Sequence, residues 1–265
     1  MKKTIFSILI GIYSFTNVTA GNLTVSGEKD KTDKTDKTEK TEKTEDKDGK
    51  KTTAQPDVPG ALVIEVANNI LTNAPETMNL NQWASWTVNI YYMYEFPFGE
   101  SSFSFNPGMG LGLETYRFEQ NFTLTTTTGD FNTEVTLLSS ILPNATDYRK
   151  SSWGIYYFDI PFEFRWYADK EFKRKSFKLA LGGKVGFRID SKTKIVYDEY
   201  DNKKKQKQKQ NFNFNSPRYG AYARVGFGAI SLYYYYSITE VFVNKRGPDE
   251  TRAKTMMVGI SISGF

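Results

Sequence analysis

The sequence predicts an all-β protein: an eight-stranded antiparallel transmembrane β-barrel that follows a disordered N-terminal tail. First, apolar and polar residues alternate over long segments, as from Trp86 to Phe96 and from Tyr156 to Trp166, which indicates strands with one apolar face. Second, charged residues share the polar positions and aromatic residues the apolar ones, which suits a polar interior surrounded by lipid. Third, the connections between these segments are alternately long and short, as in outer-membrane barrels.

Residues 1–20 are predicted to be a secretory signal peptide. Lys2 and Lys3 provide the positive charge, residues 5–15 are apolar, and Val18-Thr19-Ala20 is a small-residue cleavage motif. The apolar stretch is shorter than the roughly 20 residues that a transmembrane helix needs. We therefore expect cleavage after Ala20.

Residues 21–58 form a low-complexity linker of lysine, threonine and acidic residues. From Lys31 to Glu45 the triplet lysine-threonine-acid repeats without interruption. Such a segment has no apolar surface to bury, so we expect it to be disordered. A solvated spacer is the favoured interpretation, and a tether or cell-wall contact is the alternative.

Residues 59–265 are predicted to form the barrel. The expected strands are 61–69, 84–96, 102–117, 152–167, 176–190, 217–228, 230–242 and 253–264. Most are long enough for a tilted membrane-spanning strand of about 9 to 11 residues. Because periplasmic turns are short and extracellular loops long in such barrels, both termini are expected in the periplasm. A soluble calycin-like barrel is the alternative fold.

Each strand carries its own signal in addition to the alternation. The third, fifth and sixth strands place glycines on the lumen side, where a narrow barrel needs small residues. Aromatic residues near strand ends, such as Tyr233–Tyr236 in the seventh, suit the lipid–water boundary. The last strand places Met256 and Ile262 on its apolar side, whereas Phe265 has the opposite parity, so a bulge near Gly264 or an inward Phe265 is expected.

The chain has no histidine and no cysteine, which removes the usual general base and thiol nucleophile of outer-membrane hydrolases and proteases. We therefore expect no enzyme activity, no catalytic residue, no metal site and no cofactor. The glycines from Gly108 to Gly112 lie inside a strand and lack the spacing of a phosphate-binding loop. Hard-cation binding by Asp198, Glu199 and Asp201 is the alternative to an exposed, charge-balanced loop.

Charged residues of both signs fall on the lumen side of the predicted strands. A barrel of eight strands is only wide enough for side chains to fill, so these charges are expected to pair across strands. Glu163 and Arg165 are expected to meet Lys184 or Lys178. A salt-bridged plug is favoured over a gated ion conduit. The predicted lumen network consists of Glu95, Glu114, Asp159, Glu163, Arg165, Lys184, Arg188 and Arg224.

The net charge of +5 comes largely from two polar tracts rich in lysine, so no nucleic-acid partner is expected. The second tract, Lys203–Gln210, is predicted to be a mobile polar loop tip. Its alternative role is to bind lipopolysaccharide or host polyanions through non-specific charge attraction.

Three strings, Pro59–Val66, Thr87–Tyr94 and Phe103–Phe118, together with Trp83, carry a family resemblance. With them, the chain resembles the PorT-like outer-membrane β-barrel proteins of Bacteroidetes over most of residues 59–265. The resemblance implies an eight-stranded outer-membrane barrel, usually without an assigned activity, with one branch that takes part in protein secretion. No functional residue is carried over.

Together these observations predict a non-enzymatic, monomeric protein of the bacterial outer membrane that presents long extracellular loops. Its expected partners are outer-membrane lipid, lipopolysaccharide and the barrel assembly machinery. The alternatives are a membrane subunit of a protein secretion or transport apparatus, with secretion proteins as partners, and a small ion conduit.

Overall fold

The computed structural model describes residues 60–127, 132–169, 171–172, 175–200 and 202–264. The predicted signal peptide, the whole predicted linker and Phe265 lie outside the described residues. Residues 54–265 form one compact unit, which contains every described residue.

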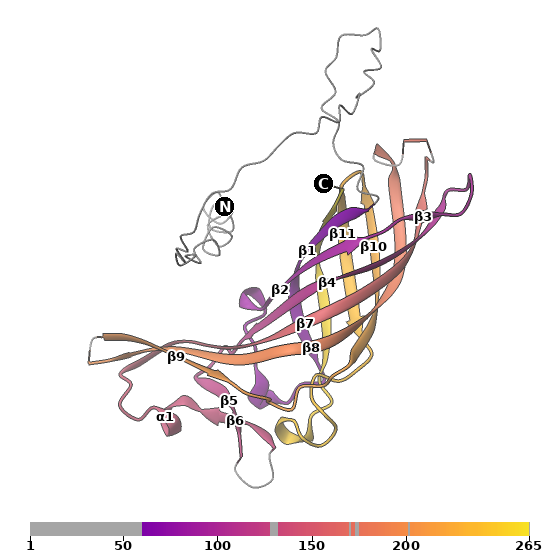
Figure 1. Cartoon of the computed structure of the whole chain (residues 1–265). Coiled ribbons are helices and arrows are strands. Elements are labelled where there is room, and N and C mark those ends of the chain that lie inside the picture. Colours follow the sequence, from indigo (N-terminus) through magenta and orange to yellow (C-terminus); the bar gives the residue numbers. More distant parts are fainter. Residues whose placement is uncertain (1–59, 128–131, 170, 173–174, 201, 265) are drawn as a thin grey trace, which may run out of the picture. The chain divides into compact units, whose positions relative to one another are not determined.

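Eight long strands form one closed antiparallel sheet (Figure 1). Each pairs with the next in chain order, and β8 pairs with β10 while β12 pairs with β1, which closes the barrel. All eight predicted strands are present. They are β1 (Ala61–Thr72), β2 (Trp86–Met93), β4 (Phe103–Arg117), β7 (Asp147–Tyr167), β8 (Phe177–Glu199), β10 (Arg218–Phe227), β11 (Ile230–Ser237) and β12 (Lys254–Ser263).

The period-two pattern separates an apolar exterior from a polar lumen, as predicted. On β4, Leu111 is 59% exposed on the outside, whereas Glu114 on the lumen side is 2% exposed. On β8 the exposed apolar side chains run from Phe177 to Ile189, about 40 Å along the strand and about 30 Å along the axis of a barrel with the usual tilt. This exterior band matches the thickness of a bilayer core.

The connections divide the barrel into two ends. The turn end carries the connections 94–102, 168–176 and 228–229 together with the start of β1 and the end of β12. The loop end carries 73–85, 118–146, 200–217 and 238–253. The alternation of long and short connections is therefore confirmed.

Several short elements decorate these connections. The strand β3 (Phe96–Pro97) extends the first turn, and at the loop end β5 (Phe122–Thr126) and β6 (Thr133–Leu137) form a separate hairpin. No helix among the described residues is long and apolar enough to cross a membrane. The helices are α1 (Leu138–Ile141), η3 (Glu76–Met78), η4 (Gln82–Ala84) and η6 (Pro248–Glu250).

Two predicted loops contain strand. β7 begins at Asp147 and β8 continues to Glu199, where it pairs with β9 (Asn202–Lys209). The prediction that Lys203–Gln210 is a loop tip was therefore wrong, because residues 203–209 belong to β9. We call residues 147–155 of β7, 191–199 of β8 and β9 the arm, which projects from the barrel wall (Figure 1).

The arm begins at a β-bulge. The pairing of β7 with β8 shifts between Tyr156 and Tyr157, which face Asp190 and Arg188, so Ile189 is the extra residue. A bulge reverses which side of the strand faces inward. Even-numbered residues of β8 face the lumen before it, whereas Ser191 and Thr193 are buried after it.

Candidate functional site: the ion network of the lumen

The lumen of the barrel holds a set of charged side chains that water does not reach. Among the described residues, four carboxylates and five cations are 6% exposed or less. They are Glu65, Glu114, Asp159 and Glu163, and Arg165, Lys178, Lys184, Arg218 and Arg224. Positive and negative charges are nearly balanced because burying a charge without a partner costs a large amount of free energy.

The first cluster is centred on Arg224 of β10. Its Nε donates to Glu65 Oε1 on β1 at 3.0 Å, and its Nη1 donates to Glu163 Oε2 on β7 at 2.6 Å. Neither β1 nor β7 neighbours β10 in the sheet, so the guanidinium connects three separated parts of the wall across the lumen. Asn89 donates a further hydrogen bond to Glu65 at 2.7 Å.

The first cluster continues toward the turn end. Arg165 Nε donates to Glu163 Oε1 at 2.9 Å, and Arg165 Nη1 donates to the Tyr167 hydroxyl at 3.0 Å. That hydroxyl in turn donates to Glu95 Oε2 at 3.2 Å. Glu163 therefore lies between two guanidinium groups, one on its own strand and one from β10.

The second cluster surrounds Asp159 of β7 and lies closer to the loop end. Its Oδ2 accepts from the Tyr91 hydroxyl at 2.8 Å and from Arg218 Nη2 at 3.0 Å. Lys184 Nζ lies 3.8 Å from the same oxygen. Arg218 also pairs with Glu114.

Glycines make room for this cluster. A Cβ atom on Gly186 would lie 2.2 Å from Asp159 Oδ1, and one on Gly112 would lie 2.7 Å from Asp159 Oδ2. Two strands thus supply empty positions beside one buried carboxylate. Gly112 and Gly186, two of the predicted lumen glycines, therefore leave room for the ion pairs, which a side chain at either position would displace.

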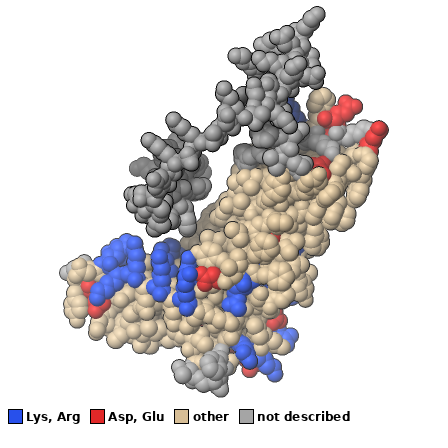
Figure 2. All heavy atoms as spheres, viewed as in Figure 1, with Lys and Arg blue, Asp and Glu red and all other residues tan. Residues whose placement is uncertain are grey.

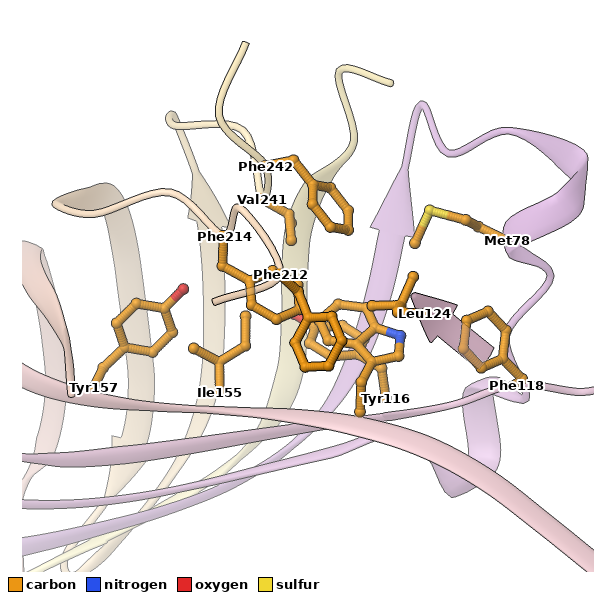
Figure 3. Close-up of a cluster of buried hydrophobic side chains, with 11 residues drawn as sticks. Met78, Tyr116, Phe118, Leu124, Ile155, Tyr157, Phe212, Phe214, Val241 and Phe242 are labelled. Carbon is orange, nitrogen blue, oxygen red and sulfur yellow. The ribbon is translucent and has the colours of Figure 1, made fainter. Parts of the chain in front are cut away.

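A cluster of buried hydrophobic side chains covers the loop end of the lumen (Figure 3). Tyr116 and Trp153 stack with ring centroids 4.0 Å apart, Trp153 and Phe214 lie 5.0 Å apart, and Phe214 and Phe242 lie 5.1 Å apart. The Tyr116 hydroxyl donates to Glu114 at 2.8 Å, which joins this aromatic cap to the second ion cluster.

Most of the predicted network comes together, although not with the predicted pairing. Glu163 meets Arg224 rather than Lys184, and Lys184 lies beside Asp159. Lys178 donates to Ser263 at 2.6 Å. The expected pairing of Glu163 and Arg165 with Lys184 or Lys178 was wrong, because Arg224 reaches Glu163 across the lumen and Lys184 meets Asp159 on the neighbouring strand β7.

Arg188, by contrast, does not join the buried clusters. It lies next to the bulge, is partly exposed and donates from Nη1 to Asn211 at 2.6 Å. One central residue, Arg218, was absent from the charges predicted to face the lumen. Arg218 lies two positions before Gly220 and six before Arg224, so strand parity alone places it in the lumen.

The arrangement favours a structural role over chemistry. Each carboxylate of the two clusters is already bound by a cation or by hydrogen-bond donors. The described residues contain no group of histidine, cysteine and acidic side chains able to hold a metal ion. In the arm, Asp198 pairs with Arg149 and Glu199 with Lys204, each at 2.6 Å, while Asp201 lies outside the described residues.

The match to a protein-family model agrees with this architecture. Residues 61–243 match the family model described as outer membrane protein beta-barrel domain. Two structures of Ail, the attachment invasion locus protein of Yersinia pestis, align with 77% of this chain and 97% of theirs. One has 11% identity and a TM-score of 0.35. The other, in complex with the heparin analogue sucrose octasulfate, has 10% and 0.32. No curated protein matches the chain.

Proposed function

This chain belongs to the outer membrane β-barrel domain family, and we propose that it is a non-enzymatic surface protein whose loop end faces the cell exterior. The barrel is a protein of the outer membrane. In this proposal both ends of the barrel chain lie on the periplasmic side, and the protein is a monomer. Membrane lipid, lipopolysaccharide and the barrel assembly machinery are its partners. The finer assignment to the PorT-like group rests on Pro59–Val66 and the other strings that resemble it.

The observation that supports this function best is the closed lumen. Arg224 connects β1, β7 and β10 across the interior, and the aromatic cap covers the loop end. A small eight-stranded barrel has no width beyond what side chains fill. The lumen therefore favours a rigid support over a conduit, and the loop end and the exterior wall become the functional surfaces.

Cysteine labelling tests the orientation, since the native chain has no cysteine. Asn144→Cys lies at the loop end and Ser101→Cys at the turn end, and both side chains are exposed. On intact cells, a membrane-impermeant maleimide is expected to label only the Asn144→Cys variant, and Ser101→Cys only after permeabilisation. The reverse pattern would show that the loop end faces the periplasm.

A pull-down tests the alternative role in a secretion or transport apparatus. The full chain is extracted from the outer membrane with mild detergent and run on gels with and without boiling, because a folded barrel migrates differently from its boiled form. Stoichiometric recovery of secretion proteins with the folded form would favour the alternative. Recovery of the barrel alone favours the proposal.

A further inference from the structure

One face of the arm concentrates positive charge. Residues that lie opposite each other in paired strands project to the same side of the sheet. Lys194 of β8 lies opposite Lys207 of β9 and opposite Ser152 of β7, and Ser152 is opposite Arg117 of β4. The lysine face, as we define it, consists of Arg117, Lys150, Lys192, Lys194, Lys203, Lys205, Lys207 and Lys209.

The lysine face forms rows of blue side chains on the arm (Figure 2). All residues of β9 are exposed. Lysines on an exposed edge strand discourage pairing with another chain, but that role does not require them to share one face.

Acidic neighbours compensate only a part of this charge. Lys209 pairs with Asp190 at 2.9 Å. Within the described residues, Lys150, Lys194, Lys205 and Lys207 form no ion pair with a carboxylate. Burial, together with the cations Lys194 and Arg117, lowers the pKa of Lys150. The centre of the lysine face is thus a group of like charges without a counter-charge from the protein.

The lysine face continues the apolar exterior of the barrel. Phe187 and Ile189 of β8 are 46% and 60% exposed on the wall, and Lys192 follows Ile189 by three residues, about 10 Å of strand. The bulge at Ile189 turns the even-numbered lysines outward. On the opposite side of the arm, Trp153 and Ile195 are buried.

The position of the lysine face favours a membrane lipid over a soluble polyanion as its ligand. The near edge of the lysine face, at Lys192, lies within about 10 Å of the apolar band and so at the depth of lipid headgroups. Lysine ammonium groups bind phosphate as point charges. We propose that the lysine face binds the phosphate groups of lipopolysaccharide in the leaflet around the barrel. The inference rests on the proposed function, because only a loop end outside the cell brings this face to that leaflet.

A binding experiment with matched variants tests the proposal. The full chain in mild detergent is titrated with bis-phosphorylated lipid A and with its dephosphorylated form. The face variant is Lys194→Gln, Lys205→Gln and Lys207→Gln combined. The control is Lys175→Gln, Lys204→Gln and Lys245→Gln, which removes the same charge from exposed positions off the face. Gel mobility without boiling verifies folding of both variants.

We expect the native chain to prefer the phosphorylated lipid and the face variant to lose about a hundredfold in affinity, at about fivefold per lysine. The control variant is expected to stay within about threefold of the native chain, on the same charge argument. Equal affinities of the face variant and the native chain for phosphorylated lipid A would overturn the proposal.

Two further outcomes distinguish a failure of this inference from a failure of the proposed function. If a soluble sulfated polysaccharide binds the lysine face and phosphorylated lipid A does not, the occupant is a soluble polymer and the proposal is wrong. If Asn144→Cys is labelled from outside and the face variant binds lipid A normally, this inference fails while the proposed function stands. Labelling of Asn144→Cys only after permeabilisation refutes both.

Discussion

Replacing Arg224 by methionine is expected to destabilise the barrel strongly, because this side chain bridges two buried carboxylates. Arg224 is 4% exposed and binds two carboxylates, Glu65 and Glu163, that are each 0% exposed. After Arg224→Met, Glu163 keeps its bonds from Arg165, whereas Glu65 keeps only the hydrogen bond from Asn89. The variant therefore leaves one buried carboxylate without a cation.

The expected loss in free energy of unfolding follows from the different partners that Glu163 and Glu65 keep. Removing one partner of a buried ion pair costs about 3 to 5 kcal/mol, because the other charge stays buried. Arg165→Met is expected to cost about 1 to 3 kcal/mol, since Glu163 retains Arg224 and loses charged hydrogen bonds only. Adding Glu65→Gln to Arg224→Met removes the stranded charge and is expected to recover about 2 kcal/mol.

The assay is urea unfolding of the barrel in lipid vesicles, with the folded fraction read from gels run without boiling. Arg252→Met, at an exposed position of the loop end, is the control and should leave the free energy of unfolding unchanged. A result for Arg224→Met within about 0.5 kcal/mol of the native chain would contradict the reasoning, as this is the range of ordinary surface substitutions. So would a double variant no more stable than the single one.

Three further predictions follow from the closed lumen, its glycines and the arm. In planar bilayers the native chain is expected to give no reproducible single-channel steps, and steps that vanish when Glu163 is neutralised would favour a conduit. Gly186→Ala is expected to cost about 1 to 3 kcal/mol by overpacking against Asp159, measured by the same urea assay, whereas Gly183→Ala meets chiefly the Phe162 ring outside the lumen and is expected to cost less. The lowered pKa of Lys150 means that the unfolded chain holds this proton to higher pH. The destabilising effect of the charged side chain is therefore present below the lowered pKa and disappears as the pH rises toward the ordinary lysine pKa of 10.5. In NMR of methylated lysines, the Lys150 signal should titrate below the pH range of an ordinary lysine, and a signal that titrates in that range would contradict the crowding of charge.

The sequence alone predicts the eight strands because the two signals used, the alternation of residue types and the positions of glycines, are local. Alternation decides which side of a strand meets the lumen, and glycine positions report where the wall comes close to other groups. For example, Gly182 and Gly186 of β8 predict crowding on the lumen side, and the structure places Glu163 and Asp159 there. Neither inference requires knowledge of which strands face each other across the barrel.

The pairing of charges in the lumen, by contrast, depends on how the sheet closes and cannot be predicted from local sequence. Arg224 and Glu65 are far apart in sequence and their strands are not neighbours in the sheet, so they meet only because the sheet closes with a particular stagger. Parity predicts that both face inward, and the stagger decides at which height each lies. Lys184, by contrast, lies opposite Pro161 on the neighbouring strand β7, between Asp159 and Glu163, and it contacts Asp159.

The arm shows how composition can hide a pattern. The tract from Lys203 to Gln210 resembles a solvated loop by composition, but its lysines and glutamines alternate from Lys205 onward. Alternation with period two indicates a strand even when both residue types are polar. The structure pairs this strand with β8, so that Lys205, Lys207 and Lys209 share one face. A disordered loop needs only the charge of these residues. A surface that holds an array of phosphates needs their charge in register, and the alternation supplies that register.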